Sequence, residues 1–338
     1  KLNATQSTAI IEGWVPKDSI RKLEEIDWIL TVKHLEKNNA PTKMTSIPLI
    51  KDFNILTKWF GVPNYSEYDP TILIAIAFPL FFAIMLGDAG YALALLTASA
   101  YVYYKTNSST IKSISAILLI SSVIATIVGL LFGSVFGNIL GFESYLNILK
   151  QPVELIKISL IIGIIHLNIG VFLGISKAIH HKDKEPLMDR LSFIALEIGT
   201  ILLITMFTHN TIRWIGLGLI VSAFAIQSRK GIIGFLEIPS TFGSWVSYIR
   251  LMALCIATSW LMFVINLAAG MAAASSIILA SIIFVFGNLF LAPLNILSAF
   301  IHSMRLHYVE FFKNFYDGSG KEFKPLKNRK KYHKEAYR

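Results

Sequence analysis

The stretch GSWVSYIRLMALCIATSWLMFVIN, residues 243–266, decides the fold class of this chain. It is largely apolar over the ~20 residues that an α-helix needs to cross the hydrocarbon of a bilayer, yet Arg250 lies inside it. A charge at the bilayer centre costs about 2.5–3.5 kcal/mol on insertion scales, so such residues are paired inside the protein or serve a function. The stretch therefore predicts a membrane helix with a buried charge.

The composition of the whole chain is typical of a membrane protein. Of its 338 residues, 54% are hydrophobic and 15% are charged, whereas a soluble domain carries about 25% charged residues. The apolar runs lie at 71–86, 90–104, 113–136, 153–177, 190–208, 212–227, 232–269 and 274–312. We therefore expect an all-α, polytopic membrane protein of about eight transmembrane helices, with two long, tilted helices at the C-terminal end.

The segment Gly-Asp-Ala-Gly at 87–90 separates the first two runs. It predicts two short helices joined by a tight turn at membrane depth, although one long helix is the alternative. We expect Asp88 to be structural, because a carboxylate at this place caps the N-terminus of the next helix.

Lysine and arginine gather in alternate connections and give the chain much of its net charge of +10. They lie in 105–112, 177–190, 228–231 and the tail 321–338. With eight spans, the positive-inside rule places these segments and both termini in the cytoplasm. The expected domains are 1–70, the end of an N-terminal cytoplasmic arm and its lead-in; 71–316, the membrane domain; and 317–338, a basic cytoplasmic tail. The tail could contact lipid headgroups or an acidic partner, and we expect no nucleic acid.

A polar stripe marks the final run. Asn288, Asn295 and His302 recur every seven residues, and Ser298 and Arg305 share the same helix face. Hydrocarbon cannot satisfy such a face, so it must meet protein or water. A hydrogen-bonded packing seam and the wall of an aqueous ion path are both open.

Other polar residues surround Arg250 in sequence. Ser247 precedes it by one helical turn, and Glu237 lies about 13 residues before it, nearly ~20 Å along a helix. The structural alternative is an arginine that snorkels to an interface or pairs with a buried carboxylate. Glu197 could pair with Arg190 or line a cavity, and for Glu310 we expect an ordinary ion pair near the surface.

The sequence lacks the patterns of soluble-enzyme chemistry. It has no glycine-rich nucleotide loop, no zinc-binding spacing and no convincing nucleophile triad, so we expect no cofactor and no metal site. Its one cysteine, Cys255, excludes a disulfide framework.

Five stretches carry a resemblance to a known family, in family order and over nearly the whole chain. They are GWVP at 13–16, YSEYDPT at 65–71, FPLFFAIMLGDAGYAL at 78–93, SYIRLMALCIA at 247–257 and HSMRLHYVEFFKNFYDGSGKEFKP at 302–325. The chain resembles the C-terminal membrane domain of the V/A-type rotary ATPase subunit that is called a in eukaryotes and I in archaea and bacteria.

The resemblance implies an integral membrane stator that is not itself catalytic for ATP. It would face the proteolipid (c or K) ring and couple translocation of H⁺ or Na⁺ to rotation through two half-channels. A long N-terminal arm, most of it preceding this chain, would reach the peripheral stalks, and other subunits would lie on the central-stalk side. The residue usage suggests an archaeal version, which would reside in the cell membrane.

The resemblance also assigns roles to residues. Arg250 matches the essential arginine of the S-Y-x-R-L motif, and Arg305 matches the second functional arginine, in a motif that includes His302 and Glu310. The other candidates for lining the half-channels are Glu237, Ser247, Asn295 and Ser298. This chain departs from some eukaryotic members, which have an acid at the place of Asn295 and a histidine at that of Thr258, so their proton path cannot be copied.

The main competing hypothesis is a secondary transporter with a mid-membrane site at Arg250. Such transporters usually show related halves with broken helices at matching positions, and this sequence has no convincing internal repeat. A purely structural membrane anchor would leave the polar stripe unexplained.

Overall fold

The computed structural model describes residues 2–4, 9–11, 13–16, 19–20, 40–44, 47–48, 50–65, 67–137, 139, 146, 148–205 and 210–325. The chain divides into two compact units. The first comprises Lys1–Thr45, Gly61–Tyr68 and Asp317–Arg338, and the second comprises Ser46–Phe60 and Asp69–Tyr316. The basic tail beyond 325 and much of the predicted N-terminal lead-in lie outside the described residues. The functions assigned to the three sequence segments stay predictions.

Short extended segments hold the first unit together. Strands β1 (Leu2–Ala4) and β2 (Ala9–Ile11) pair in antiparallel fashion. Isolated bridges join Thr42 to Glu322 and Val62 to Ser319. Residues far apart in the sequence therefore form this unit through main-chain pairing.

Every regular element of the second unit is helical in the residues described. Its elements are η3 (Lys51–Phe53), α2 (Asn54–Phe60), α3 (Thr71–Leu86), α4 (Ala89–Lys105), α5 (Ser109–Leu131), α6 (Pro152–His181), α7 (Lys184–Thr205), α8 (Asn210–Gln227), η4 (Ser228–Lys230), α9 (Ile232–Val246), α10 (Ile249–Ala273), α11 (Ile277–Arg305), the π-helix η5 (Leu306–Phe311) and η6 (Phe312–Asn314). The predicted all-α class is confirmed.

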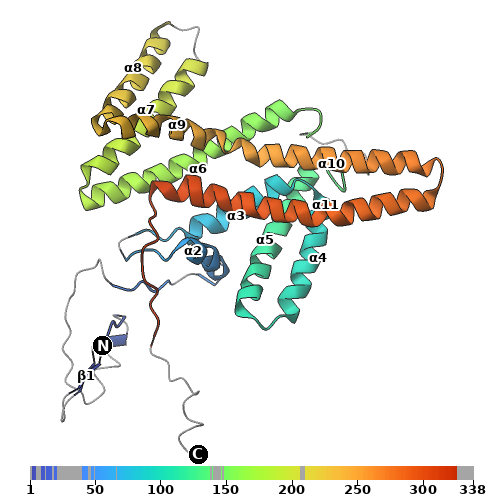
Figure 1. The fold of residues 1–338 in the computed structure, drawn as a ribbon, viewed down its shortest axis with the longest axis horizontal. Helices are drawn as coiled ribbons and strands as arrows, with labels where there is room; N and C mark the ends of the chain where they lie inside the picture. The colour runs from blue at the N-terminus through green and yellow to red at the C-terminus, as the bar shows by residue number, and fades with distance from the viewer. Residues whose placement is uncertain are drawn as a thin grey trace, which may run out of the picture. The chain divides into compact units, whose positions relative to one another are not determined.

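Three antiparallel helix pairs organise this unit: α4 with α5, α7 with α8, and α10 with α11 (Figure 1). Helix α3 packs against α5, α10 and α11 and so lies at the centre. In the view of Figure 1, α10 and α11 run side by side across the direction of α4 and α5.

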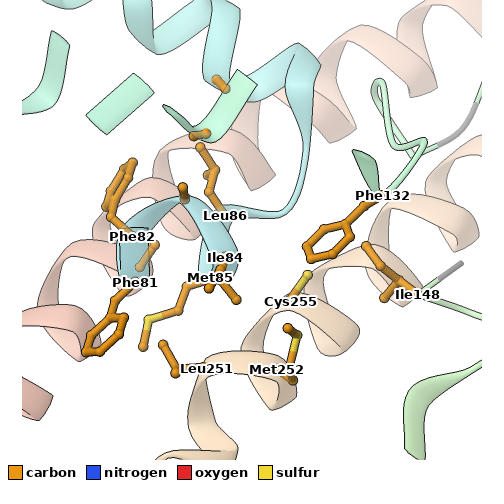
Figure 2. Packing of buried hydrophobic residues seen from close by; sticks show 14 of the residues in the cluster. Phe81, Phe82, Ile84, Met85, Leu86, Phe132, Ile148, Leu251, Met252 and Cys255 are labelled. Carbon is orange, nitrogen blue, oxygen red and sulfur yellow. The ribbon is translucent and has the colours of Figure 1, made fainter. Parts of the chain in front are cut away.

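The core surrounds the end of α3. Six consecutive side chains, 81–86, are buried, as expected for a helix that is apolar on all sides. Figure 2 shows Met85 close to Leu251 of α10, and Phe132 close to Cys255. The chain turns at Gly87 with φ of 60°, which glycine adopts without strain. A Cβ at Gly87 would also overlap the Cys255 sulfur, so this turn is packed directly against α10.

Asp88 forms the hub of the turn between α3 and α4. Its Oδ1 accepts hydrogen bonds from the main-chain N–H of Tyr91 (2.9 Å) and of Phe136 (3.2 Å). Its Oδ2 accepts from Ser134 Oγ (2.7 Å) and from the N–H of Gly137 (3.0 Å). The predicted cap of α4 and the two short helices are confirmed. The sequence did not show that the same carboxylate also holds the loop after α5.

Five helices of the described residues are long and apolar enough to cross a membrane, and α3 is a shorter apolar helix. The five are Ser109–Leu131, Pro152–His181, Thr211–Lys230, Ile249–Ala273 and Ile277–Asn314. Large apolar side chains remain exposed on them, among them Phe290, at 73%. Such surfaces need lipid or partner protein around them. The chain is an integral membrane protein, while the count of eight spans stays a prediction.

The apolar run 232–269 is not one helix, as we expected, but two, because α9 ends at Val246 and α10 begins at Ile249. At the junction, the N–H groups of Tyr248, Arg250 and Leu251 each bond a carbonyl three residues back, at 3.0–3.3 Å. This is the tighter 3₁₀ pattern. Ser247 Oγ also donates to the Gly243 carbonyl oxygen (2.8 Å), a contact that bends helices.

Candidate functional site

Two arginines from neighbouring helices meet near one carboxyl group. Arg250 lies in the first turn of α10 and is half-buried, and Arg305 is the last residue of α11 and is exposed. Each arginine interacts electrostatically with Glu310, and the two guanidinium groups repel each other. The structure thus brings together three residues that the sequence separates by up to 60 positions.

The π-helical turn explains how Glu310 reaches this place. In an α-helix, side chains five residues apart point about 140° away from each other, since each residue advances about 100°. In a π-helix the hydrogen bonds join residues i and i+5, which brings such residues to the same side. The π-helix η5 begins directly after Arg305 and includes Glu310. Glu310 is buried, so the ordinary surface ion pair that we expected for it is wrong.

Polar atoms in this region lack hydrogen-bond partners. Among the described residues, no partner exists for Arg250 Nη1, His302 Nδ1, Glu310 Oε2 and Trp245 Nε1, all of which are buried. Neither arginine forms an ion pair within the described part of the chain. Two fixed positive charges therefore face a single carboxyl group, which leaves an excess of positive charge.

The remaining candidates lie in three places. Ser247 lies beside the Glu310 carboxyl group, and His302 is close enough to both arginines to interact with their charges. Ser298 is partly buried on α11, one turn before His302. Ser247 and His302 therefore accompany the arginines, and Ser298 lies on the same helix as His302.

Asn288 and Asn295 instead bond to the helices beneath α11. Tyr91 donates its hydroxyl hydrogen to Asn288 Oδ1 (2.7 Å), and Asn295 Nδ2 donates to the carbonyl oxygen of Leu86 (3.3 Å). Both asparagines are buried. For these two positions, the hydrogen bonds agree with the packing-seam alternative, and the assignment of Asn295 to the lining of an ion path stays a prediction.

Glu237 lies on α9 in a small charged cluster. Lys230 Nζ is 3.2 Å from Glu237 Oε1 and 2.6 Å from Asp189 Oδ2. The three side chains are about a third exposed, at 30–37%. The cluster joins α7, the η4 turn and α9.

Glu197 has a partner that sequence reasoning did not consider. It accepts a hydrogen bond from Asn168 Nδ2 on α6 (2.8 Å). Arg190 donates to main-chain carbonyl oxygens, from Nε to Asn314 (3.0 Å) and from Nη1 to Pro186 (2.7 Å). Both residues therefore attach α7 to its surroundings.

Sequence reasoning also missed a buried cluster next to the site, formed by His166, Tyr248 and His307. The three side chains come from α6, from the α9–α10 junction and from η5, so no spacing in the sequence reveals the contact. Within the described ranges, no three histidine, cysteine, aspartate or glutamate side chains gather as a metal ion would require.

Comparisons with known proteins agree on one family. The model of the V-type ATPase 116kDa subunit family matches residues 1–151 and 243–328. The chain is similar to A-type ATP synthase subunit I of Thermococcus kodakarensis, with 34% identity over 98% of this chain and 56% of that protein. It is similar to subunit I of Pyrococcus abyssi (32% identity; 95% and 54%) and of Methanocaldococcus jannaschii (29% identity; 97% and 56%). The chain spans about half the length of these curated relatives.

Proposed function

The chain belongs to the V-type ATPase 116kDa subunit family, and from this premise we propose that it is the ion-translocating stator of a V/A-type rotary ATPase or ATP synthase. It would face a ring of proteolipid subunits that each carry a carboxylate at membrane depth. Relatives with the printed name A-type ATP synthase subunit I support this assignment.

The observation that carries the proposal is the excess of positive charge at the meeting point of α10 and α11. Arg250 and Arg305 face one carboxyl group, and Arg250 Nη1 lacks a partner among the described residues. A half-buried guanidinium group with an unsatisfied buried N–H is unfavourable unless an anion approaches it. A carboxylate carried by a second protein would complete this site.

The chemistry of arginine suits this role. A guanidinium group stays protonated under ordinary conditions. It therefore favours the ionised form of a carboxylate that passes within about 4–6 Å. A ring carboxylate would release its ion on meeting Arg250 and could take up another only after rotation. The same charge would stop ions from crossing directly between the two half-channels.

The path on either side of Arg250 would be lined by polar side chains of α9 and α11. We assign Glu237 and Ser247 to it from α9 and the junction that follows, and Ser298, His302 and Glu310 from α11 and η5. Helices α10 and α11 run across the direction of α4 and α5 (Figure 1). This arrangement supports a contact surface for the ring that is strongly inclined to α4 and α5.

The partners and topology follow from the same proposal. Peripheral-stalk subunits would bind an N-terminal arm, and both termini would lie in the cytoplasm, where the basic tail 317–338 could meet other subunits or anionic lipid. The ring carboxylates would decide between H⁺ and Na⁺.

Isolation of the tagged chain in mild detergent tests this function against the secondary-transporter alternative. The stator predicts that a proteolipid ring co-purifies and that its subunits outnumber the chain. A transporter with its site at Arg250 predicts a self-contained unit that binds a small solute and lacks proteolipid. Purification of the active chain free of proteolipid would overturn the proposal.

A further inference from the structure

A buried aromatic cluster includes Tyr248, which lies two residues before Arg250. It consists of His166 from α6, Tyr248 from the α9–α10 junction and His307 from η5. Tyr248 and His307 are fully buried, and His166 is 6% exposed. The ring centroids of His166 and His307 are 5.2 Å apart. The proposed function uses none of these three side chains.

One hydrogen bond joins α6 to the junction before Arg250. His166 Nδ1 and the Tyr248 hydroxyl oxygen are 2.7 Å apart, both within the buried cluster. His307 Nδ1 donates to the Ser303 carbonyl oxygen (2.8 Å), which fixes its ring to α11. The imidazole of His166 stacks on Phe311, with centroids 4.2 Å apart. Packing on two sides therefore orients the imidazole of His166 that meets Tyr248.

Helix α6 is shaped to receive Tyr248. A Cβ at Gly163, three residues before His166, would overlap Tyr248 Cγ, so only glycine leaves room for this ring. Phe81 of α3 meets the ring of Tyr248 edge to face, with centroids 6.0 Å apart. Tyr248 is thus held by shape on one face and by a hydrogen bond at its hydroxyl.

The position of Tyr248 in the chain gives this contact a consequence. Tyr248 lies in the break between α9 and α10, where the Arg250 N–H bonds the Ser247 carbonyl oxygen in a 3₁₀ turn. Arg250 follows two residues later and interacts with Glu310, whose charge also reaches Tyr248. A break between two helices with a 3₁₀ turn can act as a hinge, so that α10 can rotate relative to α9 more easily than within one continuous helix. A contact from outside the junction therefore sets the direction of the Arg250 side chain.

We propose that His166 and Tyr248 are positioning residues for ion translocation: their hydrogen bond anchors the α9–α10 junction to α6 and thereby fixes the direction of Arg250. This inference rests on the proposed function of Arg250. A displacement of about 1 Å at a reacting group is enough to lower rates severalfold or more. Loss of the bond would therefore leave the subunit assembled but weaken coupling.

The test measures ions moved per ATP hydrolysed, for each assembled complex. Tyr248→Phe removes one oxygen atom, and His166→Leu removes the other partner at similar volume. His166→Asn keeps a polar atom at the place of Nδ1. We expect the first two variants to lower the coupling ratio by about two- to tenfold, the effect of one neutral hydrogen bond. The double variant should be no worse than either one, because both remove the same bond.

His166→Asn should stay within about twofold of the unchanged protein, a rescue that loss of bulk packing would not produce. Tyr104→Phe is the matched control, since Tyr104 is 85% exposed. Normal coupling in Tyr248→Phe would overturn the inference. Additive losses in the double variant, or a His166→Asn variant as defective as His166→Leu, would also overturn it.

Measuring Arg250→Lys in the same assay separates the positioning role of His166 and Tyr248 from the proposed function of Arg250. If Arg250→Lys is uncoupled while Tyr248→Phe is normal, the positioning inference fails and the proposed function stands. If Arg250→Lys is itself coupled normally, the proposed function of Arg250 fails, and the positioning inference fails with it.

Discussion

Replacing Asp88 by asparagine keeps the side-chain size but removes its charge and turns one oxygen into an N–H₂ donor. In the structure, Oδ1 receives the amides of Tyr91 and Phe136, and Oδ2 receives the Ser134 hydroxyl and the Gly137 amide. Whichever oxygen is replaced, the new donor faces at least one main-chain N–H. At least one main-chain amide, buried or partly buried, therefore loses its acceptor.

The expected loss of stability follows from these contacts. A buried donor without a partner costs about 1–3 kcal/mol. The remaining bonds lose their charged acceptor, and neutral hydrogen bonds are roughly half as strong as charge-assisted ones. Together these effects predict a loss of about 3 kcal/mol, which corresponds to an increase of about 100-fold in the opening equilibrium of this region.

Cys255 provides a local reporter for the Asp88→Asn variant. It is the one cysteine in the sequence, it is fully buried, and its sulfur packs against Gly87, next to Asp88. When closing is faster than labelling, the rate of reaction with a thiol reagent follows the population of the open form. We expect labelling of purified Asp88→Asn protein in detergent to be about 100-fold faster than labelling of the unchanged protein.

Two controls make the Asp88 measurement specific. Ser134→Ala removes one of the four donors and should accelerate labelling by about tenfold or less, the effect of a single hydrogen bond. Thr97→Ala, at an exposed position of α4, should leave the rate unchanged. If Asp88→Asn reacted no faster than the unchanged protein, Asp88 would not hold the two segments together.

Two further variants separate structural contacts from the ion path. Asn295→Leu removes the hydrogen bond to the Leu86 carbonyl oxygen, so we expect the free energy of unfolding, measured by thermal unfolding, to fall by about 1–2 kcal/mol. Ion transport per assembled complex should stay normal. Slowed transport would instead assign Asn295 to the ion path. Lys230→Met breaks the partly exposed contacts with Asp189 and Glu237, and because such pairs contribute about 0–1 kcal/mol, thermal unfolding should change little. A larger change would mean that this cluster fixes α9.

Local chemistry made part of this structure predictable. The Gly-Asp pair at 87–88 identified both the turn and the cap, because glycine and aspartate have specific roles there. The apolar runs predicted the helical membrane class, since length and hydropathy act within one segment. The seven-residue spacing of Asn288, Asn295 and His302 correctly predicted a polar face on one helix. The hydrogen-bond partner of each residue, however, depends on which helix packs against that face.

Features set by contacts between distant segments escaped sequence reasoning. The largely apolar run continues on both sides of Ser247 and Tyr248 without a proline or a cluster of turn residues, so nothing in the pattern marks the helix break there. The bond between His166 and Tyr248 joins residues 82 positions apart. The residues of the π-helical turn that includes Glu310 show no pattern that distinguishes this turn from an α-helix. A projection of the segment as an α-helix places Glu310 and Arg305 on different faces.

We propose that Arg250 supplies a positive charge that cannot titrate, and ATP-driven ion uptake into vesicles containing the assembled Arg250→Lys complex is the decisive measurement. A lysine can lose its proton when buried, whereas an arginine does not. Arg213→Lys on α8 is the matched control and should pump normally. If Arg250 has this role, the Arg250→Lys complex assembles with its ring but shows no coupled uptake. Near-normal uptake would contradict it.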